Sequence, residues 1–384
     1  MKALLEVHIL QNFAPSNLNR DDTGSPKDAY FGGVRRGRVS SQSFKRAMRM
    51  YFKEQNLLGE DERGVRTKRF LDLLSKRLVA NGRSEEEVER AVKHALTAMG
   101  TQKNFKFDKK RPDLTEYLFP LGEKEIRGLV ETIEQHWEVF SAEKPRVPSE
   151  LKKQLEGTLN GGQAVDIALF GRMLANLPEA NQYAACQVAH AISTHKVDYD
   201  EDFYTAVDDL KPDDNAGADM IGTVEFNSAC YYRYAALDLC KLRSNLLGDG
   251  ELTLKGVEAF LRSCIYALPT GKQNTFAAHQ LPSFIGFTVR REASPRSLAN
   301  AFERPVRSSQ EGWLEASAQR LVKEWQELDE VFGQGGKSSI VNRTEAELTG
   351  TLGGAAVKSV DTLLERTLSE VRDVLGGAPS DEAR

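Results

Sequence analysis

Two hydrophobic periods follow one another in the first part of the chain. Apolar and other side chains alternate through residues 3–10, and this period of two predicts a strand. After Ser40 or Ser41 the interval lengthens to three and four residues, which predicts a helix. The apolar positions of this helix are Phe44, Met48 and Tyr51. The opening of the chain is therefore expected to be a strand, a loop and a helix.

From residue 59 to about residue 160 the chain is densely charged, and its apolar positions recur at helical spacing. Three stripes have this period: Phe70, Leu73, Leu74 and Leu78; Val88, Ala91, Val92, Ala95, Leu96 and Met99; and Ile126, Leu129, Ile133 and Trp137. We expect a helical insertion in the main domain. Residues 101–113 hold five cations and two phenylalanines. A solvated loop is favoured there over a nucleic-acid contact.

Strand patterns return in the second half. Residues 184–197 and 222–239 predict strands, and the acidic segment between them, with no clear period, predicts a long extended loop. Residues 163–173 fit a helix or a strand, and the glycines on either side favour a strand. Further elements are expected as a helix at 251–268, a strand at 282–290, helices at 311–332 and 357–375, and a Gly/Ser linker at 333–339. This order is consistent with a β-α-β-β-α-β arrangement, and hence an α+β fold.

Positive charge is concentrated between residues 20 and 49. The cations of this window are Arg20, Lys27, Arg35, Arg36, Arg38, Lys45, Arg46 and Arg49, and its acids are Asp21, Asp22 and Asp28. The window carries +5 in a chain of net charge −4, so the remainder carries −9. A positive focus in an acidic protein indicates an anion site, and the start of the helix offers backbone N–H groups for phosphate. A solvated basic face is the alternative.

Overall composition is that of a globular protein, with 40% hydrophobic and 28% charged residues in 384. No apolar run approaches the roughly 18 residues that span a bilayer. The N-terminal apolar stretch is too short for a signal peptide. The four cysteines show no CxxC spacing, so a zinc site and a disulfide framework are not expected and a reducing cytosol fits. His190 and His195 fall on opposite faces of a predicted strand, so no metal site is expected there.

Several segments of the chain resemble one known family. They are Asn19 to Asp22, Lys27 to Ala29, Phe31 to Gly33, Arg38 to Arg49, Asp166 to Met173, Ala189 to Ile192 with Thr194 and His195, Phe203 to Asp209, and Pro295 to Glu303. They resemble the CasC-type backbone subunit of the type I-E CRISPR Cascade complex, of the RAMP group. The segments are spread over most of the chain.

The resemblance implies a modified RNA-recognition-motif (ferredoxin-like) palm with a helical fingers insertion and a protruding thumb hairpin. The palm would comprise 1–58, 162–196 and 228–384, the fingers 59–161 and the thumb 197–227. Copies of the chain would line up along a CRISPR RNA and present its bases to target DNA. Other Cascade subunits (large, small, guide 5′-end-capping and guide-processing) would be partners. No cofactor and no catalysis are implied. The aromatic octapeptide with which related modules read RNA on the sheet face is absent, so loops, helix and thumb would carry recognition.

The expected RNA-binding residues combine both lines of reasoning. Phosphate contacts are expected from Arg20, Lys27, Arg38, Lys45, Arg46 and Arg49, and hydrogen bonds from Ser40 and Gln42. The resemblance adds Met173 and Tyr204 as residues that pack on bases, and an aromatic ring can stack on any base. For Met173, burial in the core is an equal alternative. Residues 268–276 lack a Walker pattern, but Gly271 and Lys272 would supply a further backbone contact.

Two other functions compete with guide-RNA binding. Asp21 and Asp22 in a basic loop could hold Mg²⁺, as in a RAMP ribonuclease. Adjacent carboxylates usually diverge, however, and the Asn-Arg-Asp-Asp run also makes a sound turn. A helical scaffold without nucleic acid would leave the basic window unused. A structural RNA-binding subunit is therefore the favoured prediction.

Overall fold

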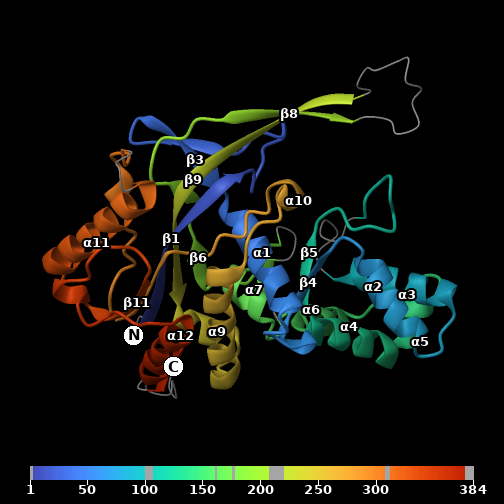
Figure 1. Ribbon diagram of the computed structural model, residues 1–384. Coiled ribbons are helices and arrows are strands. Elements are labelled where there is room, and N and C mark those ends of the chain that lie inside the picture. The colour runs from blue at the N-terminus through green and yellow to red at the C-terminus, as the bar shows by residue number, and fades with distance from the viewer. Residues whose placement is uncertain are drawn as a thin grey trace, which may run out of the picture. The chain divides into compact units, whose positions relative to one another are not determined.

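The computed structural model describes residues 3–99, 107–160, 162–174, 178–206, 220–307 and 312–376 (Figure 1). The chain divides into two compact units, which are described separately. The first consists of Met1–Gln55, Gln187–Cys240 and Val257–Arg384, and the second of Asn56–Cys186 and Lys241–Gly256. The division into palm, fingers and thumb at the stated boundaries stays a prediction.

The first unit is built on one sheet, in which nine of the described strands take part. Its order is β11-β10-β1-β9-β7-β3-β2, with β6 and β8 also paired to β9, and each ladder along this order is antiparallel. The strands are β1 (Ala3–Ser16), β2 (Asp28–Phe31), β3 (Val34–Val39), β6 (Cys186–Val188), β7 (Ala191–Ser193), β8 (Asp200–Ala206), β9 (Met220–Asp238), β10 (Phe284–Arg291) and β11 (Gly336–Asn342). The helices are α1 (Ser41–Glu54), α9 (Gly250–Tyr266, which begins in the second unit), α10 (Gln273–Phe276), α11 (Gly312–Phe332) and α12 (Val360–Gly376), with 3₁₀ turns η3 (Ala299–Phe302) and η4 (Gly350–Leu352).

A ferredoxin-like core lies within this sheet. Along the chain it runs β1-α1-β7-β9-α9-β10, and in space its strands take the order β10-β1-β9-β7. This is the β-α-β-β-α-β unit that the sequence predicts, so the predicted α+β fold class is confirmed. The two helices of the unit lie together, since Tyr51 of α1 and Tyr266 of α9 stack with 6.3 Å between ring centroids.

Both faces of the core sheet are covered (Figure 1). On one face, Val7 and Ile9 of β1 meet Phe44 and Met48 of α1. On the other face, His8 lies 4.6 Å, between ring centroids, from Trp325 of α11, which is 1% exposed. An RNA-recognition motif stacks bases on an open sheet face. Here α11 occupies that face.

The segment expected to be a loop between residues 20 and 38 contains a hairpin, which corrects the prediction. β2 and β3 pair from Asp28↔Gly37 to Phe31↔Val34. The turn consists of Gly32 and Gly33, with φ of 59° and 79°. Positive φ at both central residues is typical of the hairpin turn that matches strand twist, and a Gly-Gly pair adopts it without strain.

Three other predictions are corrected. Residues 165–170 form helix α7 and not a strand; all six residues are buried, so no polar face marks the helical period. The expected Gly/Ser linker at 333–339 contains the start of β11, which pairs with β10. The expected strand at 184–197 is two short strands, β6 and β7, separated by two residues.

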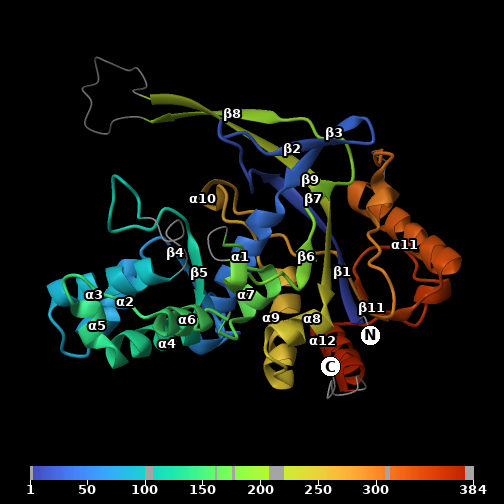
Figure 2. The same ribbon diagram turned by 180° about the vertical axis from the view of Figure 1, so that it is seen from behind.

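The long segment between the second-half strands is partly a hairpin rather than a loop. β8 pairs with β9 from Asp200↔Phe226 to Ala206↔Met220. Figure 2 shows β8 and the paired end of β9 extending beyond the rest of the sheet. This is the protruding hairpin of the predicted fold class. Residues 207–219 lie outside the described part of the chain.

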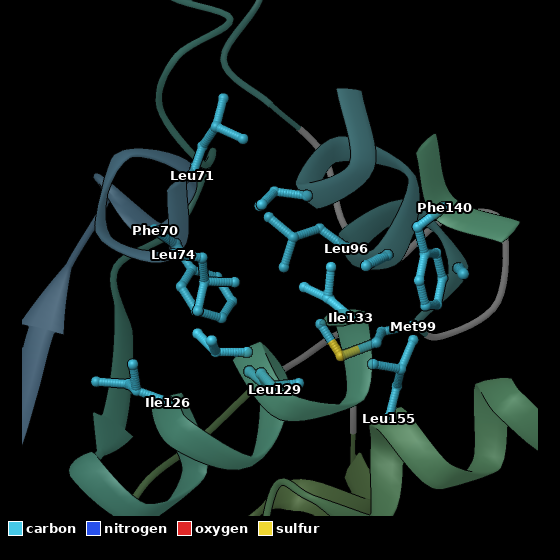
Figure 3. Close-up of a cluster of buried hydrophobic side chains, with 14 of the residues drawn as sticks. Phe70, Leu71, Leu74, Leu96, Met99, Ile126, Leu129, Ile133, Phe140 and Leu155 are labelled. Atoms are coloured by element: carbon cyan, nitrogen blue, oxygen red, sulfur yellow. The ribbon is translucent and has the colours of Figure 1, made fainter. Parts of the chain in front are cut away.

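The second unit is mainly helical around its own apolar core. Its helices are α2 (Phe70–Val79), α3 (Glu85–Ala98), α4 (Glu123–Gln135), α5 (Trp137–Ser141), α6 (Ser149–Gly157), α7 (Val165–Phe170) and most of α8 (Leu239–Asn245), with β4 (Gly64–Thr67) paired to β5 (Phe119–Gly122) and 3₁₀ turns η1 (Glu60–Glu62) and η2 (Pro178–Ala180). Figure 3 shows Phe70, Leu96, Ile126 and Phe140 meeting in this core. The three predicted apolar stripes supply most of it. Residues 101–106 of the cation-rich segment lie outside the described residues.

Candidate nucleic-acid interface

Helix α1 begins next to the basic hairpin, and its start is tied to the preceding loop. The hydroxyl of Ser40 accepts a hydrogen bond from the Ser43 N–H at 3.3 Å and caps the helix. The Ser40 N–H in turn donates to Oδ1 of Asn19 at 2.9 Å. The first turn contains no acidic residue. The positive end of the helix dipole is therefore not offset by a carboxylate within its own turn, an arrangement that favours an anion.

His190 joins this helix start from the segment between β6 and β7. Its Nδ1 accepts the Ser41 N–H at 3.0 Å. In the neutral ring the proton then lies on Nε2, which is a hydrogen-bond donor. The pKa of His190 is lowered, first by its partial removal from water and then by the charges of Arg38 and Lys27. Lys27 and Arg38 thus lie near His190, which itself contacts the start of the helix.

The cations of α1 lie away from its buried stripe. Phe44, Ala47, Met48 and Phe52 face the core, whereas Arg46 is exposed and Lys45 and Arg49 are half-buried. Gln42 is exposed in the first turn. The predicted side chains on α1 therefore continue the surface that begins at Lys27 and Arg38. Their role in binding stays a prediction.

Several cations of the basic window have partners within the chain, among them Arg38, whose Nε donates to the carbonyl of Asp28 at 2.9 Å. Arg36 is 0% exposed, and its guanidinium donates to four backbone carbonyls, those of Phe31, Ser193, Phe302 and Glu303. Arg35 forms an ion pair with Asp28 at 3.2 Å. The positive charge counted from the sequence of this window is therefore larger than the charge that its surface presents to a ligand.

Arg20 is exposed at the stem of the β1–β2 loop, which is closed by Asp21. Oδ1 of Asp21 accepts from the N–H and hydroxyl of Thr23 at 2.9 and 2.7 Å and from the Ser25 N–H at 3.0 Å. These bonds lower the pKa of Asp21, that from the Thr23 hydroxyl most. The loop is thus an Asp-closed turn, one of the two alternatives that the sequence left open.

The predicted backbone contact at Gly271 and Lys272 lies against the same loop. A Cβ at Gly271 would lie 2.3 Å from the carbonyl oxygen of Leu18, so only glycine fits. Lys272 has a φ of 49° and begins the short helix α10. Segments 250 residues apart in the sequence are therefore brought together at the β1–β2 loop.

The β8–β9 hairpin carries two exposed aromatic side chains on opposite faces. Tyr204 pairs with Gly222, and its ring lies directly over that glycine, since a Cβ there would lie 2.4 Å from the ring. Tyr204 remains 49% exposed and its neighbour Phe203 is 69% exposed. The stem around them is acidic, with Asp200, Glu201, Asp202 and Glu225. Sequence reasoning singled out Tyr204 and missed Phe203, although both are visible as aromatics in one strand.

Met173 belongs to the second unit and so is considered by itself. Met173 is 86% exposed, although the preceding residue, Arg172, is buried. Burial in the core, the other interpretation of this methionine, is therefore wrong. The structure groups the remaining predicted residues, apart from Tyr204, around the β1–β2 loop, the β2–β3 hairpin and α1.

Comparison with known proteins gives one family and a set of solved structures. A family model described as CT1975-like protein matches residues 5–370. A structure titled "CRISPR RNA-guided surveillance complex, pre-nicking" contains a chain with a TM-score of 0.84 and 29% identity, covering 96% of this chain and 100% of its own. A second, titled "CRISPR RNA-guided surveillance complex", gives a TM-score of 0.74 and 25% identity over 95% and 99% of the two chains. A search of curated proteins gave no match.

Proposed function

Since the chain belongs to the family of CT1975-like proteins, we propose that it is an RNA-binding subunit of a CRISPR RNA-guided surveillance complex. The two similar structures support this, because each is a chain of a complex with that title and matches nearly the whole length. Among the residues that the structure describes, no helix combines the length and apolar character needed to cross a bilayer.

The more specific proposal is a backbone subunit of a type I-E Cascade that acts in the cytoplasm without catalysis. Successive copies would bind along one CRISPR RNA, hold its phosphates and present its bases to target DNA, beside the other Cascade subunits. In such assemblies base pairing reads the sequence and the protein reads the backbone.

One observation carries the proposal. Lys27 and Arg38 lie near His190, which contacts the start of α1, and the first turn of this helix holds no acidic residue while cations lie on its outer side. Phosphate is the group that fits an imidazole N–H and cations at the positive end of a helix dipole. The sheet face is covered by α11, so RNA would be bound by the loop, hairpin and helix.

A metal-dependent ribonuclease that uses Asp21 and Asp22 is the competing proposal. It has less support, because Oδ1 of Asp21 is occupied by three hydrogen bonds within its own turn. Within the described ranges, no three histidine, cysteine, aspartate or glutamate side chains are grouped to hold a metal ion.

The test is to incubate the purified chain with labelled single-stranded RNA, with and without Mg²⁺, and to divide each sample between a native and a denaturing gel. A salt-sensitive shift with intact RNA is expected. Shortening of the RNA that requires Mg²⁺ and is lost in Asp21→Ala or Asp22→Ala would replace the proposal by the ribonuclease. Absence of a shift at low salt would contradict both.

A further inference from the structure

Among the residues that the structure describes, four arginines are buried, and three of them have several acceptors or a carboxylate as partners. Arg172 and Arg290 each pair with a buried carboxylate. Arg36 donates to four backbone carbonyls. The fourth is Arg233 of β9, which is 6% exposed. A buried charge is normally balanced by an opposite charge or by a set of hydrogen bonds, so the surroundings of Arg233 require an explanation.

Arg233 has little to balance its charge within the described part of the chain. Its Nη1 donates to Oε1 of Gln11 at 2.6 Å, and its guanidinium carbon lies 4.2 Å from the centroid of the Phe44 ring. The Gln11 amide is oriented for this contact, because its Nε2 donates to the carbonyl of Gln280 at 2.7 Å. Among the described residues no carboxylate forms an ion pair with Arg233. One neutral amide oxygen therefore serves a cation that has five N–H donors.

A small cavity between the sheet and α1 lies against Arg233. Its walls include Phe44 and Met48 of α1, Ala189, Arg233 and Cys264, all of the first unit. Its volume is about 10 Å³, close to the roughly 10–15 Å³ that one water-sized species needs. A phosphate, a carboxylate or a nucleotide is therefore too large for it. Ala189 is exposed, so this wall of the cavity lies next to solvent.

The thiol of Cys264 is a second donor at the cavity and does not supply the negative charge. Burial raises the pKa of the Cys264 thiol to about 12, so the sulfur keeps its proton at neutral pH and is a weak S–H donor. Burial lowers the pKa of Arg233 to about 10, which still leaves the guanidinium charged at neutral pH. The cavity thus combines a fixed positive charge and a thiol donor with apolar walls.

We propose that this cavity binds one monoatomic anion, chloride, held by the guanidinium of Arg233 with the Cys264 thiol as a second donor. A water molecule would fill the same space but would leave the charge unbalanced. Chloride is slightly larger than water, and the unbranched side chain of Met48 can adjust to it. Because Phe44 and Met48 belong to α1, the bound ion would stabilise the packing of this helix on the sheet. The site goes beyond the proposed function and does not depend on it.

The experiment measures urea unfolding of the full-length chain, without RNA, while sodium chloride replaces sodium gluconate at constant ionic strength. Gluconate is too large for the cavity. A ligand that binds only the folded state lowers the unfolding equilibrium constant by about tenfold for each tenfold rise in its concentration above its Kd. We expect this dependence in the wild type and its loss in Arg233→Met, which removes the charge and keeps an unbranched side chain. Arg304→Met, at an exposed position of the same unit, is the matched control and should behave like the wild type.

Wild-type crystals grown in bromide give a second measurement that needs no variant to fold. The anomalous difference map should show a peak in the cavity next to Arg233. Unfolding that is the same in chloride and in gluconate, or a bromide map without this peak, would overturn the proposal. A chloride dependence that persists unchanged in Arg233→Met would place the ion elsewhere and would overturn it as well.

Discussion

The salt dependence of RNA binding tests the α1 surface quantitatively. Of the eight cations between residues 20 and 49, Arg36 is buried against four carbonyls and Arg35 is paired with Asp28. The other six are the predicted phosphate contacts. Each contact to a single strand contributes a slope of about −0.7 in log K against log salt, so six predict about −4, whereas eight would give nearly −6. Lys45→Ala should make the slope shallower by about 0.7 and should weaken binding equally for unrelated sequences.

Fluorescence anisotropy with two labelled RNAs of different sequence, between about 50 and 200 mM salt, measures both quantities. Lys323→Ala is the matched control, because it removes the same charge from a side chain that is 76% exposed on α11. It should leave the slope unchanged. A slope that does not change in Lys45→Ala, or a loss confined to one sequence, would refute the assignment of Lys45 to phosphate.

Three further predictions concern pH, the buried Glu125–Arg172 ion pair of the second unit and loop packing. Burial lowers the pKa of His8 to about 4, so the folded chain binds fewer protons than the unfolded chain between pH 6.5 and 4. About 3 kcal/mol of stability should be lost as pH falls through that window, and urea unfolding of His8→Gln should lack this part of the loss. Glu125→Ala leaves the charge of Arg172 without its carboxylate and should cost about 3–5 kcal/mol, seen as faster hydrogen exchange in the second unit. Gly271→Ala should displace the β1–β2 loop and weaken RNA binding, whereas Gly157→Ala, with open space around it, should not.

The local pattern of apolar and polar residues was sufficient to predict an element where one of its faces is buried and the other is exposed to solvent. The helix after Ser40 is such an element, and its period and cap agree with the tertiary structure. The strand at 3–10 is buried on both faces, and its period of two is visible because buried Glu6 and His8 alternate with apolar residues. The prediction of a strand at 163–173 was wrong because all six residues of helix α7 are buried, so no polar face shows the helical period. The β2–β3 hairpin was missed although Gly32-Gly33 between two β-rich runs is a turn signal.

The candidate site was predictable in part for a similar reason. The cations of α1 follow from charge and helical spacing alone. His190 approaches Ser41 across 149 residues through the pairing of β3 with β7, and no local pattern reports such a contact. The buried role of Arg36 was equally invisible, because a sequence shows a charge but not the carbonyls around it.

Strand β9 gives the β8–β9 hairpin a length that can be adjusted. One unbroken strand of 19 residues pairs with β1 in the core and with β8 beyond it, so the hairpin is a stiff continuation of the sheet. Its seven residue pairs span about 23 Å. Inserting one residue in β8 would exchange the faces of Phe203 and Tyr204, whereas inserting two in each strand would keep them and lengthen the arm by about 7 Å. The length of the hairpin can therefore change only in steps of two residues per strand if Phe203 and Tyr204 are to keep their faces. This holds for natural variation and for engineered variants alike.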